Sequence, residues 1–155
     1  EPPVTTFTKF SQNDPRWKDV KMGISDYKLG GWGCTTSSVA TLGTWFGETL
    51  TPQIYAKSLN LYTSDGRILW NQIEKVSDKI KFKWRNWGFN EAMIDEALNN
   101  PNTAITFNVD RGYHWVSALK KVNGGYLCSD PYPFPAVNRK YAFDEVQGFA
   151  ILTKQ

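Results

Sequence analysis

The chain has 155 residues, of which 41% are hydrophobic and 21% charged, enough apolar material for a packed core and unlike a disordered tail. Its net charge of +3 is small and its basic residues are scattered, which argues against a nucleic-acid-binding surface. Two cysteines and one histidine are too few for a disulfide scaffold or an ordinary zinc site. We expect one domain over residues 1–155, with residues 1–8 as an extended arm, and no metal or cofactor.

Helical signals begin after Gly31-Trp32-Gly33, which should break regular structure. A first helix is predicted from about Cys34 to Gly47, because its apolar residues recur at helical spacing. These residues are Val39, Leu42, Trp45 and Phe46. Thr51-Pro52 then has the pattern of an N-cap followed by proline at the first helical position, which predicts a short helix to about Asn60.

Two more helices and one strand are predicted before residue 100. The third helix has an apolar stripe of Ile68, Leu69, Ile73 and Val76. The fourth is capped by Asn90 and carries Ile94, Ala97 and Leu98. Between them, Phe82 and Trp84 alternate with lysines, a pattern typical of a short, half-buried strand.

From residue 103 the pattern changes to strands. Residues 103–109, 113–122 and 125–129 are β-rich, and Asn123-Gly124 predicts a hairpin turn between the last two. Residues 149–152 predict a final buried strand, and residues 141–143 a further short one. Helices followed by strands indicate an α+β domain with an antiparallel sheet.

Cys34 is the candidate nucleophile. A thiol attacks as the thiolate, and a helix N-terminus stabilises that anion through its partial positive charge and unpaired amides. Gly33 would leave room for a substrate backbone to approach, and the four residues after Cys34 keep the first turn polar. The alternative is that Cys34 is a small buried hydrophobic residue.

His114 is the only histidine, so an imidazole general base must be this residue. It lies near the start of a predicted strand, from which its side chain could project towards a packed helix. The alternative is a structural histidine bonded to a carbonyl group.

Asp130 is the candidate that orients the base, because a carboxylate can accept from imidazole and fix its tautomer. If the turn at Asn123-Gly124 is a three-residue loop with a bulged glycine, Asp130 shares a sheet face with His114. A strict two-residue loop would place Asp130 on the opposite face. Asp110 and Asn108 are the reserve candidates, and Asp130-Pro131 could simply end a strand.

Four short motifs follow one another along the chain: Gln12-Asn13-Asp14-Pro15-Arg16-Trp17, Gly33-Cys34-Thr35-Thr36-Ser37-Ser38-Val39-Ala40, His114-Trp115-Val116 and Asp130-Pro131. Together they resemble the bacterial and phage cysteine peptidases of cysteine peptidase family 39. That family is named for enzymes that remove double-glycine leaders from bacteriocins. The resemblance implies a papain-like fold with a Cys34, His114 and Asp130 triad.

The resemblance also implies that Gln12 donates to the oxyanion, since a tetrahedral intermediate needs preorganised donors. Asp14 and Trp17 are expected to lock the loop that carries Gln12. In the leader peptidases the glutamine precedes the cysteine by only a few residues, whereas here 22 positions separate them. The chain is therefore more similar to the stand-alone branch, found in secreted, prophage or virion proteins.

The expected activity is a cysteine peptidase that cleaves peptide bonds in a protein or in peptidoglycan. Trp32 and Trp115 flank the catalytic candidates, so we expect them, with Gly33, to wall the substrate cleft. The implied location is secreted, cell-wall-associated or virion-associated. No apolar run is long enough for a membrane span, and a monomer is expected.

Three rival functions remain open: a peptidoglycan amidase or endopeptidase with the same triad, an inactive binding module of the same fold, and a transferase that uses the thioester. Cys128 is predicted to be a core thiol, with a disulfide to Cys34 as the alternative. That disulfide would silence the site.

Overall fold

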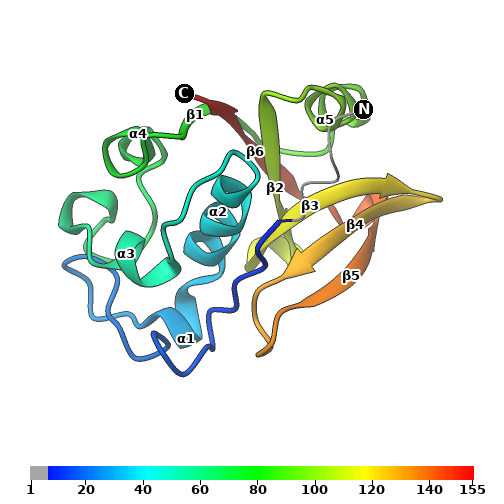
Figure 1. Ribbon diagram of the computed structural model, residues 1–155. Coiled ribbons are helices and arrows are strands. Elements are labelled where there is room, and N and C mark those ends of the chain that lie inside the picture. Colours follow the sequence, from blue (N-terminus) through cyan, green and yellow to red (C-terminus); the bar gives the residue numbers. More distant parts are fainter. Residues whose placement is uncertain (1–6) are drawn as a thin grey trace.

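The computed structural model describes residues 7–155. Five α-helices within this range are α1 Leu29–Trp32, α2 Cys34–Thr44, α3 Pro52–Ala56, α4 Ile73–Val76 and α5 Glu91–Asn99. The six strands of the described part are β1 Ile80–Asn86, β2 Thr103–Val109, β3 His114–Val122, β4 Gly125–Asp130, β5 Val137–Ala142 and β6 Gly148–Lys154. They form one sheet in the order β1-β6-β2-β3-β4-β5, with every neighbouring pair antiparallel (Figure 1). The predicted α+β class is confirmed.

The sheet separates two hydrophobic cores because residues alternate between its faces. On β2, Ala104 packs into the core that contains α2, whereas Ile105 packs into the core that contains α5. Leu152 and Ile151 on β6 divide in the same way. Figure 1 shows α2 lying against one face of the sheet with α3 and α4 beyond it. Helix α5 packs on the other face, against β2 and β3.

Helix α2 is buried along most of its length, from Thr36 to Gly43. Several of its polar side chains are bonded to other elements, although Ser37 Oγ has no hydrogen-bond partner. Ser38 Oγ donates to the Trp115 carbonyl oxygen at 3.3 Å, and Ser117 Oγ donates to the Ser38 carbonyl oxygen at 3.0 Å. These bonds join α2 to β3, so the elements that carry Cys34 and His114 are directly fastened together.

The N-terminal segment runs along α2 from its last turn to its first. The backbone amide of Thr8 donates to Thr44 Oγ1 at 2.8 Å, and the amide of Phe10 donates to Thr41 Oγ1 at 3.0 Å. The backbone amide of Gln12 then donates to the Pro131 carbonyl oxygen at 2.8 Å. Its side chain bonds to Gly30 in α1, which directly precedes α2. Of the expected arm, residues 1–6 lie outside the described residues, and residues 7 and 8 contact α2.

The strand predictions for residues 103–109, 113–122 and 125–129 are confirmed, as is the Asn90 cap, whose side chain accepts from the Met93 amide. The strand expected at residues 141–143 is instead β5, which begins earlier. The predicted helix to about Asn60 ends at Ala56 and is followed by a 3₁₀ turn.

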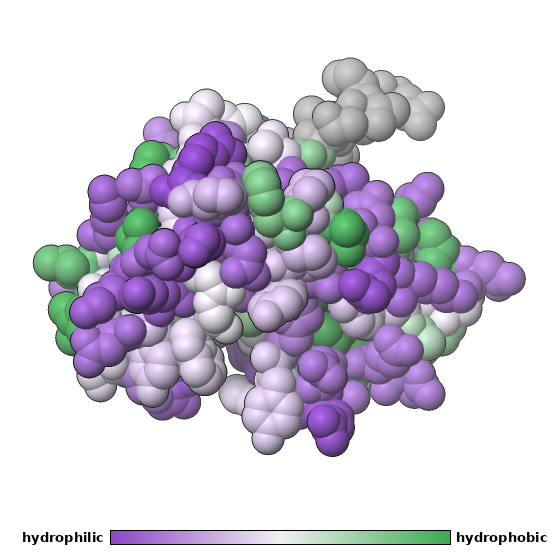
Figure 2. Space-filling model, turned by 90° about the horizontal axis from the view of Figure 1, so that it is seen from below, coloured by the Kyte–Doolittle hydropathy of each residue, from purple (hydrophilic) through white to green (hydrophobic). Residues whose placement is uncertain are grey.

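The third predicted helix was wrong over most of its length. Ile68 forms a β-bridge with Tyr62, residues 70–72 form a 3₁₀ turn, and only α4 is α-helical. Helix α1 was not predicted, because the sequence of Leu29–Trp32 contains two glycines. Figure 2 shows a face that is mostly hydrophilic, with hydrophobic residues scattered over it. No described helix is long and apolar enough to cross a bilayer.

Candidate active site

Cys34 is the first residue of α2, as predicted. Gly33 ends the short α1 and serves as the N-cap of α2. A Cβ atom on Gly33 would lie 2.7 Å from the Leu29 carbonyl oxygen, so glycine allows the two helices to meet at this angle. The amides of the first helical turn have no partner within α2, and the positive end of the helix dipole is directed at Cys34.

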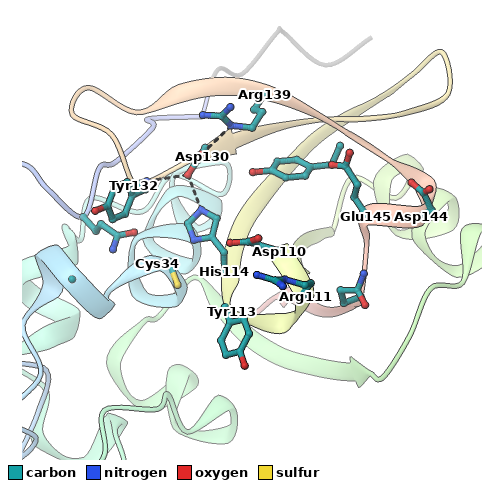
Figure 3. Close-up of a pocket in the computed structure, with 14 residues that line it drawn as sticks. Cys34, Asp110, Arg111, Tyr113, His114, Asp130, Tyr132, Arg139, Asp144 and Glu145 are labelled. Atoms are coloured by element: carbon teal, nitrogen blue, oxygen red, sulfur yellow. Dashed lines mark hydrogen bonds and ion pairs between the residues drawn. The ribbon is translucent and has the colours of Figure 1, made fainter.

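His114 and Asp130 lie side by side on neighbouring strands. His114 Nε2 and Asp130 Oδ1 are 2.7 Å apart, and Figure 3 shows the imidazole between Asp130 and Cys34. Because Nε2 is bonded to the carboxylate, Nδ1 is the ring nitrogen left for the thiol side. The structure therefore brings together the three side chains that the sequence analysis selected, in the order thiol, imidazole, carboxylate.

The register that places Asp130 beside His114 depends on a β-bulge. The turn is a two-residue loop, because Val122 pairs with Gly125. That loop alone would place Asp130 on the opposite face from His114. Leu119 is unpaired, however, since Ala118 pairs with Cys128 and Lys120 with Leu127. This extra residue shifts the register by one and returns Asp130 to the face of His114.

The electrostatics of the site favour a charged imidazole. Burial disfavours the cation, but the hydrogen bond to Asp130 and the interaction with Cys34 outweigh it and raise the pKa of His114 to about 9. At neutral pH the imidazole is therefore protonated and faces the thiol. An imidazolium beside a cysteine stabilises the thiolate, which is the nucleophilic form.

Three hydrogen-bond donors fix the carboxylate of Asp130 in place. Oδ1 accepts from His114 and from the Tyr132 amide at 3.0 Å, and Oδ2 accepts from Arg139 Nε at 3.1 Å. Burial opposes ionisation, but these bonds, with the His114 contribution foremost, lower the pKa of Asp130. The carboxylate thus remains ionised and fixed against the imidazole.

Gln12 lies at the start of α2 and is only 1% exposed. Its Nε2 donates to the Gly30 carbonyl oxygen at 3.1 Å, which orients the amide and leaves the second N–H of Nε2 for another acceptor. The loop before α1 is locked as expected. Asp14 accepts from the Arg16 backbone and guanidinium, and Trp17 Nε1 donates to the Ser11 carbonyl oxygen at 2.7 Å.

These side chains line one cleft of about 710 Å³. Its lining is Gln12, Gly31, Cys34, Asp110, Arg111, Tyr113, His114, Asp130, Tyr132, Arg139, Tyr141, Asp144, Glu145 and Gln147. All four predicted catalytic residues thus belong to one concave surface. The Cys34 thiol is therefore accessible from a concave surface of a size typical of ligand sites.

The three predicted substrate-binding residues are not among those that line this cleft. Trp32 is exposed and contacts Tyr27, and Trp115 packs against Trp70 beneath the Arg85 guanidinium. Neither these tryptophans nor Gly33 belong to the cleft lining within the described chain. The Gly33 backbone is needed for packing against Leu29 rather than for room above the cleft.

Arg139 was not anticipated from the sequence. It lies on β5 opposite Cys128 and so on the face of β4 that carries Asp130. An exposed arginine in a short strand has no distinctive pattern, so only the β4–β5 register could have identified it. The reserve candidates have other positions. Asp110 lines the cleft, and the Asn108 side chain binds backbone carbonyls rather than the imidazole.

Cys128 is fully buried in the core that contains α5, and burial raises its pKa. Both cysteines are free thiols in the structure. Between residues 7 and 155 there is no group of three or more side chains that could hold a metal ion.

Comparisons with known protein families, with curated proteins and with solved structures find no match to this chain. A thiol at a helix N-terminus, an imidazole held by a carboxylate and a side-chain amide at the same cleft are the parts required for acyl transfer.

Proposed function

We propose that the chain is a cysteine-dependent hydrolase with a papain-like fold that cleaves peptide or related amide bonds. The observation that carries the proposal is the 2.7 Å contact of His114 Nε2 with Asp130, which leaves the other ring nitrogen for Cys34. The order Gln12, Cys34, His114, Asp130 agrees with the order in the peptidases that the sequence resembles.

Each step of the reaction has a residue to perform it. The Cys34 thiolate attacks the substrate carbonyl carbon, and the oxyanion accepts from the Cys34 amide and from Gln12 Nε2. His114 gives its proton to the leaving amine as the C–N bond breaks, which leaves a thioester on Cys34. His114 then takes a proton from water, whose oxygen attacks the thioester and releases the acid and the thiolate.

The first experiment measures the rate at which iodoacetamide alkylates each cysteine between pH 5 and 9, read by peptide mass spectrometry. We expect Cys34 to react rapidly at pH 6, where an ordinary thiol is almost entirely protonated, and His114→Ala to slow it. Cys128 is an internal control, because the buried thiol should stay unmodified in the folded protein. A slow Cys34 that is indifferent to His114→Ala would instead favour an inactive binding module.

The second experiment separates the substrate classes. Unfolded protein and purified peptidoglycan are incubated with the wild type and with Cys34→Ala. Release of peptides from the first identifies a peptidase, clearing of the second identifies a wall amidase or endopeptidase, and a higher yield with an added amine identifies a transferase. A secreted, wall-associated or virion-associated location belongs to the same proposal, as does a monomer that binds neither nucleic acid nor membrane.

A further inference from the structure

His114 follows a turn with an unusual backbone. Asp110 and Arg111 adopt positive φ angles of 51° and 55°, and Gly112 follows at 94°. Residues with side chains rarely adopt this left-handed conformation, and the surrounding structure must hold them in it. This turn connects β2 to β3, so its shape determines where the first residue of β3 presents its side chain.

Asn108 holds the β3 end of this connection. Its Nδ2 donates to the Gly112 carbonyl oxygen at 3.0 Å and to the His114 carbonyl oxygen at 3.1 Å. Both partners are acceptors, so the nitrogen of the amide must face them. A single amide nitrogen thus binds the backbone on both sides of Tyr113, at Gly112 and at His114.

Asn108 is itself rigidly placed. It lies on the central strand β2, opposite Trp115 on one side and Gly148 on the other. The backbone carbonyl oxygen of Asn108 accepts from the backbone amide of Gln147 at 2.8 Å, and the residue is only 7% exposed. Two hydrogen bonds from this one side chain therefore hold Gly112, the last residue of the turn, and His114, the first residue of β3, in place against β2.

We propose that Asn108 is a positioning residue, which sets the imidazole of His114 by holding the Asp110–Gly112 turn against the sheet. The proposal rests on the proposed function, in which His114 is the proton-transfer group. The chemistry requires an amide, because two donors on one atom are needed. Aspartate offers none when ionised, serine offers one and alanine offers none.

The test compares Asn108→Ala with Thr106→Val. Thr106 lies two residues earlier on β2, and its Oγ1 donates to the Val116 carbonyl oxygen at 2.8 Å. The control therefore removes a buried side-chain bond between the same two strands but leaves the turn intact. Because His114 is the only histidine, its ring protons give a single set of NMR signals whose titration can be followed directly.

In Asn108→Ala we expect the His114 titration midpoint to fall by about one pH unit as the ring loses its fixed contacts. Alkylation of Cys34 by iodoacetamide at pH 6 should slow about tenfold, since small displacements of reacting groups carry large rate penalties. Thr106→Val should lower stability with neither change. Equal titration curves and alkylation rates in the two variants would overturn the proposal.

Asn108→Ser provides the second variant where Asn108→Ala does not fold. With one donor in place of two, its alkylation rate should lie between those of the wild type and His114→Ala, and its His114 titration midpoint should lie below that of the wild type. Values equal to the wild type would count against the proposal. Failure of the proposed function itself gives a different result. In that case the wild type and His114→Ala would alkylate Cys34 at the same rate.

Discussion

The contact between His114 and Asp130 is the best-defined feature of the site at the scale of single residues. Removing the charge with Asp130→Asn should lower the pKa of His114 from about 9 towards its ordinary value, because the carboxylate is the largest favourable contribution. NMR titration of the single histidine measures this. Asp144→Asn is the control, since Asp144 lines the cleft but makes no hydrogen bond to the imidazole.

Gln12 gives a second prediction at this scale. If its Nε2 stabilises the oxyanion, Gln12→Ala should reduce kcat by about 10²- to 10³-fold with little change in KM. Asn13→Ala is the matched control. Asn13 Nδ2 donates to the Tyr132 carbonyl oxygen at 2.5 Å, so this variant loosens the same segment without removing the donor. Equal activity in the two variants would exclude the oxyanion role.

The nucleophile and the base could be predicted because cysteine and histidine are rare in this chain. A single histidine leaves no choice of base, and Gly33-Cys34 before a helical pattern indicates the nucleophile. Asp130 could be proposed but not fixed, because its face depends on register. Arg139 and Asn108 act through contacts with other elements, and no local pattern in the sequence encodes such contacts.

At the scale of elements, Glu48 joins the helical part to the sheet. The buried carboxylate accepts from Tyr55 Oη on α3 at 2.5 Å and from Ser77 Oγ. Ser77 Oγ in turn accepts from the amides of Lys79 and Ile80 at the start of β1. Burial, the largest influence, raises the pKa of Glu48 above its ordinary value.

This raised pKa makes the stability of the junction pH-dependent. A carboxyl group whose pKa is higher in the folded state stabilises the fold below its unfolded pKa, and this contribution is lost as pH rises through the folded pKa. Glu48→Gln should therefore raise the free energy of unfolding at pH 8 by about 1 kcal/mol and give no gain at pH 4. Urea denaturation at both pH values measures this, with the exposed Glu74→Gln as control.

Sequence periodicity found the elements that bury a regular pattern and missed those shaped by their neighbours. All seven residues of β2 are buried, and its β-rich pattern is plain in the sequence. Helix α1 has only four residues and is stabilised by packing and by its junction with α2 at Gly33. The apolar residues assigned to a third helix serve a bridge, a 3₁₀ turn and α4 instead, because the core contacts there are satisfied without one continuous helix.

For the whole molecule, the site makes folding depend on pH in a second way. His114 has a higher pKa in the folded state, about 9, than the ordinary value of 6.5. Its contribution to stability is complete below pH 6.5 and is lost as pH rises through 9. The lowered pKa of Asp130 has the opposite effect, and its contribution is lost as pH falls through the acid range.

The stability difference between the wild type and His114→Gln should therefore be largest near pH 6 and shrink by pH 9.5. Urea denaturation of both proteins at these pH values measures the change. A difference that stays constant across this range would show that the imidazole gains no charge-dependent stabilisation on folding.

The bulge at Leu119 has a consequence for how the chain can vary in length. Because side chains alternate along β3 and β4, adding or removing one residue within either paired strand between the turn and the site reverses the face on which Asp130 lies. Related or engineered hairpins that keep His114 and Asp130 on one face should therefore change the paired segments by even numbers of residues, or gain or lose a bulge with each odd change. A longer loop grafted onto the Asn123-Gly124 turn is free of this rule, because residues added to the loop leave the pairing of Val122 with Gly125 unchanged.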